Sequence, residues 1–181
     1  MARRPWMARA SSASDRLCMN GVILNEAGTE DIEILVALMR EFYAEANYSL
    51  DLTRARESFE QLQRQPALGR AFIVNAGSEV AGYLVLTLTF SMEYGGLSAF
   101  LDDLYIRPHF RGKRVGTAAL AWLEECARSL DVRAIHLEVG RDNAPGLSLY
   151  RSAGFKDNDR QLLTLQLAPA SHENGTASAE P

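Results

Sequence analysis

Cysteine and histidine are scarce in this chain of 181 residues, which has 2 Cys and 3 His. Cys18 lies near the N-terminus and Cys126 within a helical pattern, so they form neither a disulfide framework nor a zinc site. So few Cys and His also give no basis for a Ser-His-Asp or Cys-His catalytic arrangement. We therefore expect no metal, and a reducing, cytoplasmic setting.

Long apolar runs and an excess of basic residues are absent as well. No stretch approaches the roughly 18–20 apolar residues that a membrane span requires. The net charge is -4, so no general attraction to nucleic acid or to an anionic membrane is expected. With 47% hydrophobic residues, the chain has the composition of one globular domain.

The ends differ from the middle in composition. Residues 1–20 are rich in Arg, Ser and Ala, which suits a disordered extension and superficially resembles an organellar transit peptide. Residues 169–181 are small and polar and suit a disordered tail. We expect a single domain over residues 21–168.

Apolar spacing in that domain alternates between strand and helix periods. Helical spacing begins at Thr29, near Asp51, at Gly116 and at Asn143. Strands are predicted over residues 22–24, 71–74, 80–90, 98–106, 133–139 and 162–167. Residues 71–90 form a hairpin around an Asn-Ala-Gly-Ser turn. The order predicts a mixed α/β fold with a central mixed sheet flanked by helices.

The sequence lacks both the Walker A pattern and the GxGxxG dinucleotide pattern. Instead, a strand runs into a basic, glycine-containing loop and then directly into a helix, LYIRPHFRGKRVGTAAL at residues 104–120. Unpaired N–H groups and the helix dipole favour an anion there, and nearby cations add to this. The segment therefore predicts a pyrophosphate cradle, although an exposed basic turn is the alternative.

A second segment, EVGRDNAPGLSLYRSAGF at residues 138–155, has the pattern of a strand, a capped short helix and a stop. Asn143 suits the N-cap, with Pro145 in the first turn and Gly154 past the end. Tyr150 lies in the third turn of this helix. Capping and core packing alone would explain Asn143 and Tyr150.

Together the two segments resemble the GCN5-related N-acetyltransferases. Residues 110–118, FRGKRVGTA, are similar to the coenzyme A loop of that family, [QR]xxGx[GA], except that Arg114 replaces its first glycine. The pattern NxxGxxLYxxxGF at residues 143–155 resembles its second hallmark. The resemblance implies acetyl-CoA as cosubstrate and Tyr150 as the acid that protonates the thiolate. It also implies acetyl-CoA-binding positions at Leu104, Tyr105, Ile106, Arg111, Gly112, Lys113, Arg114, Val115, Gly116, Thr117, Asn143 and Tyr150.

Acetyl transfer to an amine also requires a base, and Asp102 and Asp103 stand out in an otherwise apolar strand. Adjacent strand residues point to opposite faces, so we expect at most one of them to line a given cleft. An ion pair or a solvated residue is the structural alternative. Glu138 and a chain of waters remain second choices for the base.

Residues 100–113 further resemble the polyamine and thialysine branch, in which Asp102 would be the base or the substrate anchor. Asp103 and Glu93 would add charge to a pocket for a small cationic amine. Protein acceptors remain open, as do a non-catalytic acyl-CoA-binding module and a nucleic-acid-binding patch. A small-molecule acceptor without nucleic acid or membrane is expected, and a homodimer is common in the family.

Overall fold

The computed structural model describes residues 21–167. The expected N-terminal extension at residues 1–20 and the expected tail at residues 169–181 lie outside the described residues, as does Cys18.

The described residues contain one five-stranded sheet in the order β1-β2-β3-β4-β5. The neighbours from β1 to β4 are antiparallel, and β5 is parallel to β4. The strands are β1 Val22–Glu26, β2 Gly69–Ala76, β3 Glu79–Ser91, β4 Gly96–Ile106 and β5 Ala134–Leu137. The helices are α1 Ile32–Glu45, α2 Leu52–Arg64, α3 Val115–Ser129 and α4 Ala144–Ser152. The parallel pair requires a crossover, which α3 supplies.

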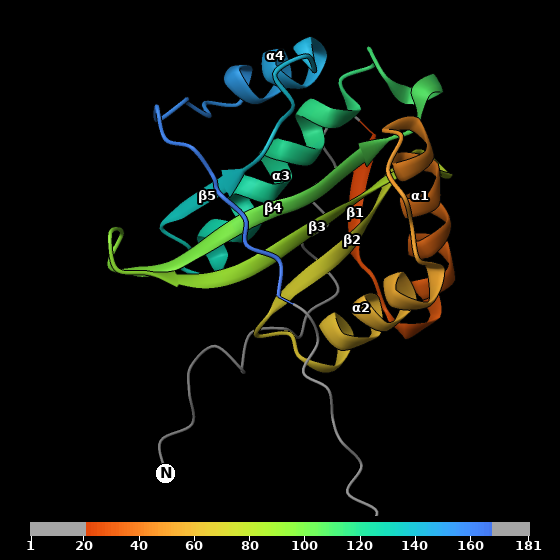
Figure 1. Cartoon of the computed structure of the whole chain (residues 1–181). Coiled ribbons are helices and arrows are strands. Elements are labelled where there is room, and N and C mark those ends of the chain that lie inside the picture. The colour runs from red at the N-terminus through yellow and green to blue at the C-terminus, as the bar shows by residue number, and fades with distance from the viewer. Residues whose placement is uncertain (1–20, 168–181) are drawn as a thin grey trace, which may run out of the picture.

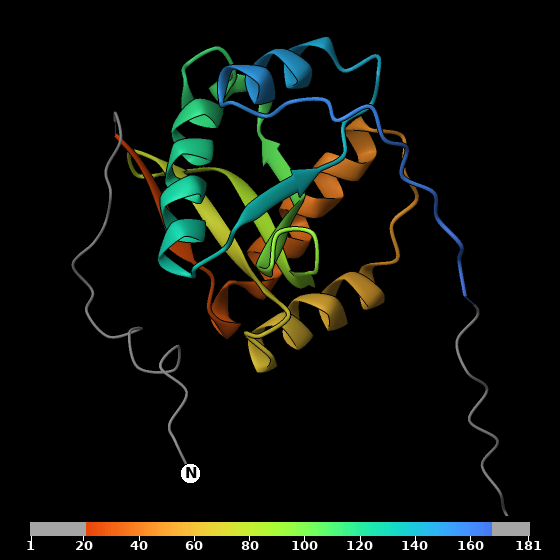
Figure 2. The ribbon, with the colours of Figure 1, turned by 90° about the vertical axis from the view of Figure 1, so that its left-hand side faces the viewer.

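Alternation along the strands buries two separate cores, one on each face of the sheet. Phe72 and Val74 of β2 pack on the α3 side, whereas Ala71 and Ile73 pack on the side of α1 and α2. Residues at even spacing thus share a face, as the pleat requires. The sheet is covered on both faces, by α1 and α2 on one and by α3 on the other (Figures 1 and 2).

Side-chain caps define two of the helix starts. Asp51 accepts hydrogen bonds from the N–H groups of Thr53 and Arg54 at the start of α2. The Oδ1 of Asn143 accepts one from the Gly146 N–H, 2.9 Å away, at the start of α4. Both caps satisfy donors that have no partner inside the helix. The helix start predicted at Asn143 is confirmed, and of the two candidates for the second helix, Asp51 and Thr53, Asp51 is the N-cap.

The predicted mixed fold is confirmed, but the strand predicted over residues 162–167 is wrong. That segment is irregular and pairs with no described strand. Its leucines are exposed by 66–86%. These leucines are Leu162, Leu163, Leu165 and Leu167. Alternation alone specifies a strand only where a sheet edge and a buried face are available, and here the apolar residues cover nothing.

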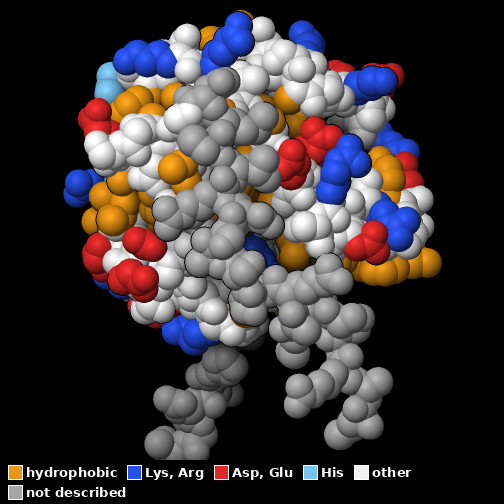
Figure 3. All heavy atoms as spheres, turned by 180° about the vertical axis from the view of Figure 1, so that it is seen from behind, with side chains coloured by type: hydrophobic (Ala, Val, Ile, Leu, Met, Phe, Trp, Pro, Cys, Tyr) orange, Lys and Arg blue, Asp and Glu red, His pale blue; other side chains and the backbone are white. Residues whose placement is uncertain are grey.

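Charges of both signs are spread over the surface seen in Figure 3, where blue and red side chains alternate with apolar and white ones. That face carries no continuous basic surface in its described part. Among residues 21–167, no helix combines the length and the apolar character needed to cross a bilayer.

Alanine substitutions in the 162–167 segment test this arrangement. Leu163→Ala and Leu165→Ala remove exposed side chains, so each should change the free energy of unfolding by less than about 0.5 kcal/mol. The control Leu84→Ala lies in a fully buried position of β3 and should cost about 2–5 kcal/mol. Denaturant unfolding measures both. A cost at Leu163 or Leu165 comparable to that at Leu84 would show that the segment is packed.

Candidate functional site

A β-bulge in β4 is the first feature of the site. Asp103 stands opposite Val85 of β3, and Leu101 stands opposite Leu86, so Asp102 between them has no partner residue. A bulge adds one residue to one strand and bends it locally. The extra residue interrupts the alternation of side chains along β4.

The bulge corrects our expectation that the adjacent acids point to opposite faces. Leu101 and Leu104 both pack into the core on the α3 side, although they are three positions apart in the sequence. Asp102 and Asp103 between them therefore both face the side of α1 and α2. Sequence alternation could not predict this, because the extra residue has no signature in an apolar strand.

Both carboxylates line one pocket of about 310 Å³. Its remaining wall comes from α1, α2, β3 and the end of the α2–β2 loop, and it is largely apolar. The wall residues are Met39, Ala55, Ser58, Phe59, Gln61, Leu62, Leu68, Val85 and Thr87. No Lys, Arg or His lines this pocket, and the ion pairs formed within residues 21–167 include neither acid. The pocket thus combines negative charge with apolar walls.

The two acids differ in environment. The hydroxyl of Tyr83 donates a hydrogen bond to Oδ2 of Asp103 over 2.9 Å. Burial raises the pKa of Asp103 to about 6; the Tyr83 hydrogen bond opposes this rise and the Asp102 charge adds to it. Asp102 is more exposed, and partial burial raises its pKa from the ordinary value. A pKa of about 6 leaves the Asp103 carboxyl mostly ionised near neutral pH and protonated below it.

The helix start predicted as an anion cradle has unpaired donors. The backbone N–H groups of residues 112–117 form no hydrogen bond to any group in the described part of the chain. Gly112 has φ +72° with open space around its α-carbon. Gly116 lies against Leu149 of α4, where an added Cβ would stand 3.1 Å from a methyl group. The residues present fit an anionic, diphosphate-bearing group.

Arg114, the departure from the family pattern, adopts a left-handed conformation with φ +63° at the N-cap of α3. Glycine occupies this conformation without strain, whereas residues with a Cβ do not. The chain therefore keeps the backbone shape that the glycine of the family pattern would favour, at some cost in strain.

Arginines before the cradle are tied to α1. Arg107 forms a bidentate ion pair with Glu41, at 2.7 and 2.9 Å, and Arg111 forms one with Glu45, at 2.6 and 2.8 Å. The Nε of Arg111 also donates to the Ile106 carbonyl over 2.7 Å. These guanidinium groups therefore hold the loop to α1. A nucleic-acid-binding patch would use Arg107, Arg111, Lys113 and Arg114, and the first two of these are neutralised by the ion pairs with α1.

The edge of β4 opens toward the cradle. Pairing with β5 runs from Ser98–Ala134 to Leu101–Leu137 and stops there. In the described part of the chain, residues 102–106 have no strand beside them on that side, which leaves the backbone at Leu104–Ile106 available to a ligand. The expected positions of the cradle and the open edge thus lie on consecutive segments of chain.

Tyr150 of α4 is partly buried and packs against the core on the α3 side of the sheet. Burial raises the pKa of its phenol, and the charge of Asp103 raises it further. Its ring packs edge-on against Phe155, with centroids 5.9 Å apart. Tyr150 does not line the pocket of Asp102 and Asp103, and its role as the acid stays a prediction.

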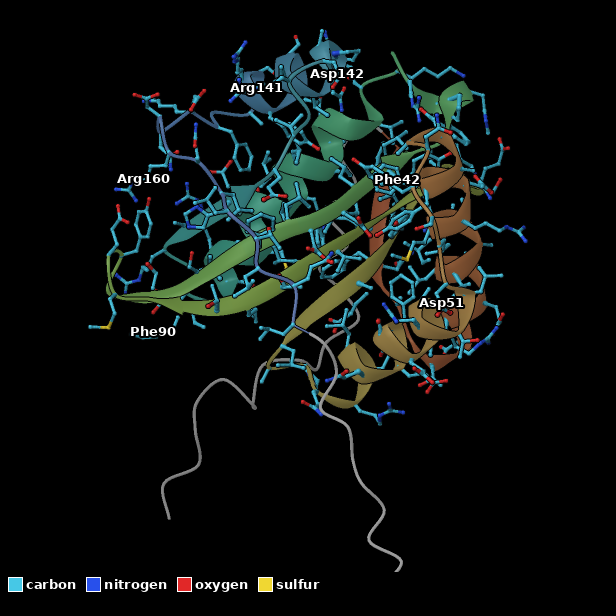
Figure 4. The ribbon with its side chains drawn as sticks, in the orientation of Figure 1. Phe42, Asp51, Phe90, Arg141, Asp142 and Arg160 are labelled. Atoms are coloured by element: carbon cyan, nitrogen blue, oxygen red, sulfur yellow. The ribbon has the colours of Figure 1, made fainter. Side chains whose placement is uncertain are left out.

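Glu93 and Glu138 are not brought to the acidic pocket. Glu93 lies in the β3–β4 turn and pairs with Arg160, at 2.7 and 3.1 Å. Figure 4 shows Arg160 and Phe90 at the hairpin end of the sheet, apart from Phe42 of α1. Glu138 is exposed just beyond β5. Neither residue lines the pocket that Asp102 and Asp103 share.

Sequence analysis missed Tyr83 and the wall that α2 supplies. Tyr83 is fully buried, and its position in an apolar strand indicates only packing. A buried Tyr needs a partner for its hydroxyl, which is the one signal that could have pointed to it. The α2 residues that line the pocket have helical spacing, but none of them has an ionisable side chain that would point to a site.

The fold and the site together define an acyltransferase that uses an acyl-CoA donor. Residues 35–155 match the acetyltransferase (GNAT) family, and the chain belongs to that family. It is an acetyl-CoA-dependent N-acyltransferase. Among residues 21–167, no group of three or more His, Cys, Asp or Glu is placed to hold a metal ion.

Named relatives cover most of the chain. It is 26% identical to the aminoalkylphosphonate N-acetyltransferase of Salmonella typhimurium over 135 residues, which span 75% of this chain and 85% of that one. It is 26% identical to the thialysine N-epsilon-acetyltransferase of Bos taurus over 149 residues, again 75% and 85%.

Solved structures also match. An integron cassette protein from a salt-marsh metagenome has 43% identity and a TM-score of 0.73 over 83% of this chain and 93% of that one. A predicted acetyltransferase from Clostridium acetobutylicum, solved with acetyl-CoA, has 17% identity and a TM-score of 0.67, over 80% and 96%. At this identity the second match supports the fold alone.

Replacing Arg114 by glycine tests the strain in the cradle. Arg114→Gly replaces a residue with positive φ by glycine, which adopts this conformation without strain. The neighbouring Lys113→Gly also removes one positive charge, but at a position where φ is not positive, so it relieves no strain. The first variant should be more stable than the second by about 1 kcal/mol. Chemical denaturation of both proteins measures the difference. Equal stabilities would mean that the conformation at Arg114 carries no strain.

The Arg111–Glu45 pair should affect donor binding by holding the loop. Arg111→Gln and Glu45→Gln should each weaken coenzyme A binding by up to about fivefold, since an exposed pair contributes up to ~1 kcal/mol. The double variant should be no worse than either single one, because both remove the same contact. The exposed pair Glu124–Arg128 gives the control Glu124→Gln. Calorimetric titration with coenzyme A measures all four, and a loss in Arg111→Gln alone would instead assign the arginine to direct phosphate contact.

Proposed function

We propose that the chain transfers the acetyl group of acetyl-CoA to the primary amine of a small cationic molecule. The observation that carries this proposal is the pair Asp102 and Asp103, which face one largely apolar pocket without a cationic partner in it. Such a pocket suits an ammonium group attached to an apolar body.

On the donor side, the unpaired N–H groups of residues 112–117 would receive the pyrophosphate, with Lys113 and Arg114 adding charge. The backbone of Leu104, Tyr105 and Ile106 offers hydrogen bonds to the pantetheine arm. Asn143 has its Oδ1 engaged in the cap of α4, which leaves its amide NH₂ group for the same arm. Acetyl-CoA, when bound, supplies the acetyl group as a thioester.

The amine must lose a proton before it can attack. An alkylamine with a pKa near 10.4 is neutral in only about one molecule in 2,500 at pH 7, a cost of roughly 4.6 kcal/mol. Asp102 assists this deprotonation as part of the acidic pair. A carboxylate that holds the ammonium group can accept its proton directly or through water at the point of attack, and general-base assistance of this kind contributes about 10²–10⁴-fold to the rate.

Tyr150 would complete the proton balance. The neutral nitrogen forms a bond to the acetyl carbon as the carbon–sulfur bond breaks, and the Tyr150 hydroxyl gives its proton to the departing sulfur. The nitrogen then loses a second proton, which restores Tyr150. Acetylamide, free thiol and one proton released to solvent are the net products.

Relatives suggest two classes of small amine. They are the acceptors of the aminoalkylphosphonate and thialysine N-acetyltransferases. A phosphonate would meet two carboxylates and no cation in the pocket of this chain, whereas a cationic acceptor would meet complementary charge. The pocket therefore favours the second class. A protein acceptor and a non-catalytic acyl-CoA-binding role are the alternatives.

Acetyl-CoA-dependent thiol release separates these functions. With amines of similar length, 1,4-diaminobutane or lysine should exceed 2-aminoethylphosphonate in kcat/KM by about tenfold or more. Asp102→Asn should raise the KM for the diamine about fivefold, as expected for a lost, partly exposed charge contact. Glu93→Gln, whose acid pairs with Arg160 outside the pocket, is the matched control.

Saturable acetyl-CoA binding without release for any amine or peptide would favour the binding module. Preferred acetylation of the phosphonate would reject the cationic class. Release with peptides alone would indicate a protein acceptor.

A further inference from the structure

We propose that Tyr83 is a positioning residue that holds Asp103 as the proton acceptor, which leaves Asp102 to anchor the ammonium group. This inference rests on the proposed function and gives the two acids different roles. It assigns the proton-accepting role to Asp103, which the sequence predicted only as an additional charge in the amine pocket.

The geometry favours Asp103 for this role. The Tyr83 hydroxyl binds Oδ2 of Asp103 at 2.9 Å, while Oδ1 has no hydrogen-bond partner in the described part of the chain. One oxygen is thus fixed and the other is left to accept a proton. Asp102 has no such support, because its side chain accepts no hydrogen bond from the described residues.

Tyr83 can hold Asp103 in place because its own position is fixed. Its side chain is 0% exposed. The ring packs edge-on against Phe59 of α2 at 6.4 Å between centroids, and lies tilted against Tyr105 at 6.4 Å. Contacts with both α2 and β4 restrict its rotation, so the hydroxyl presents a fixed donor to the carboxylate.

Four titratable side chains interact with Asp103 through charge or a hydrogen bond: Tyr83 of β3, Asp102 of β4, Tyr43 of α1 and Tyr150 of α4. Helix α2 contributes no titratable side chain to the pocket. The tyrosines are neutral near pH 7, since burial raises the pKa of each. Tyr83 and Asp102 affect the pKa of Asp103 in opposite directions: the hydrogen bond lowers it and the like charge raises it.

Opposite shifts provide the test. In the free protein, carbon-13 NMR of the Asp103 carboxyl should titrate with a midpoint near the pKa of about 6. Tyr83→Phe keeps the ring but removes the donor, so the midpoint should move to higher pH. Asp102→Asn removes the like charge, so the midpoint should move to lower pH. Tyr94→Phe, a substitution at an exposed hairpin tyrosine, is the control and should leave it unchanged.

The pH dependence of the reaction rate should shift in the same directions as the carboxyl titration. The acid limb of the pH profile of kcat/KM, where the base becomes protonated, should move to higher pH in Tyr83→Phe and to lower pH in Asp102→Asn. Asp103→Asn should lower kcat on the order of a hundredfold at every pH, as expected for a lost general base. Asp102→Asn should instead act mainly on the KM of the amine.

An unshifted carboxyl titration in folded Tyr83→Phe would overturn the positioning role, as would equal kcat in wild type and Asp103→Asn. If Tyr83→Phe fails to fold by circular dichroism, the Asp102→Asn shift and the Asp103→Asn kcat decide the matter. Absence of any amine acetylation, with the NMR shifts present, would reject the proposed function while leaving the Tyr83–Asp103 interaction intact.

Discussion

The β-bulge at Asp102 is the constraint on which the rest of the site depends. Because Asp102 has no partner opposite it on β3, both acids face α1 and α2. The pairing of β4 with β5 also stops at Leu101, immediately before the bulge. One extra residue thus creates both the acidic pocket on one face and the open strand edge toward the cradle. The two substrates of an acyltransferase need such neighbouring, separate approaches to one reaction centre.

Helix α1 connects these two approaches. Glu41 and Glu45, one turn apart, hold Arg107 and Arg111 beside the cradle. On the same helix, Met39 lines the acidic pocket and Tyr43 lies near the acid pair. The same helix therefore contributes to the wall of the pocket and to the contacts that hold the basic loop.

Local patterns in the sequence predicted the fold because most elements satisfy their local preferences and their tertiary contacts at once. Asp51 and Asn143 are the N-caps of α2 and α4, near the predicted helix starts, and the cradle lies in the segment between β4 and α3 and at the start of α3. The shared face of Asp102 and Asp103 could not be predicted, since it depends on register with β3. Tyr83 was missed for the same reason: only the folded sheet brings its hydroxyl to Asp103. The leucines at 162–167 show the reverse error, a strand pattern with no sheet edge beside it.

The most direct test of the bulge as the organising feature is a crystal structure of the chain with coenzyme A and a small diamine. The account predicts the ammonium nitrogen within hydrogen-bond distance of Asp102 or Asp103, in the pocket between α2 and the sheet, with the pantetheine arm along Leu104–Ile106. A diamine bound beside Glu93 or Glu138, with Asp102 and Asp103 turned to opposite faces of β4, would contradict it.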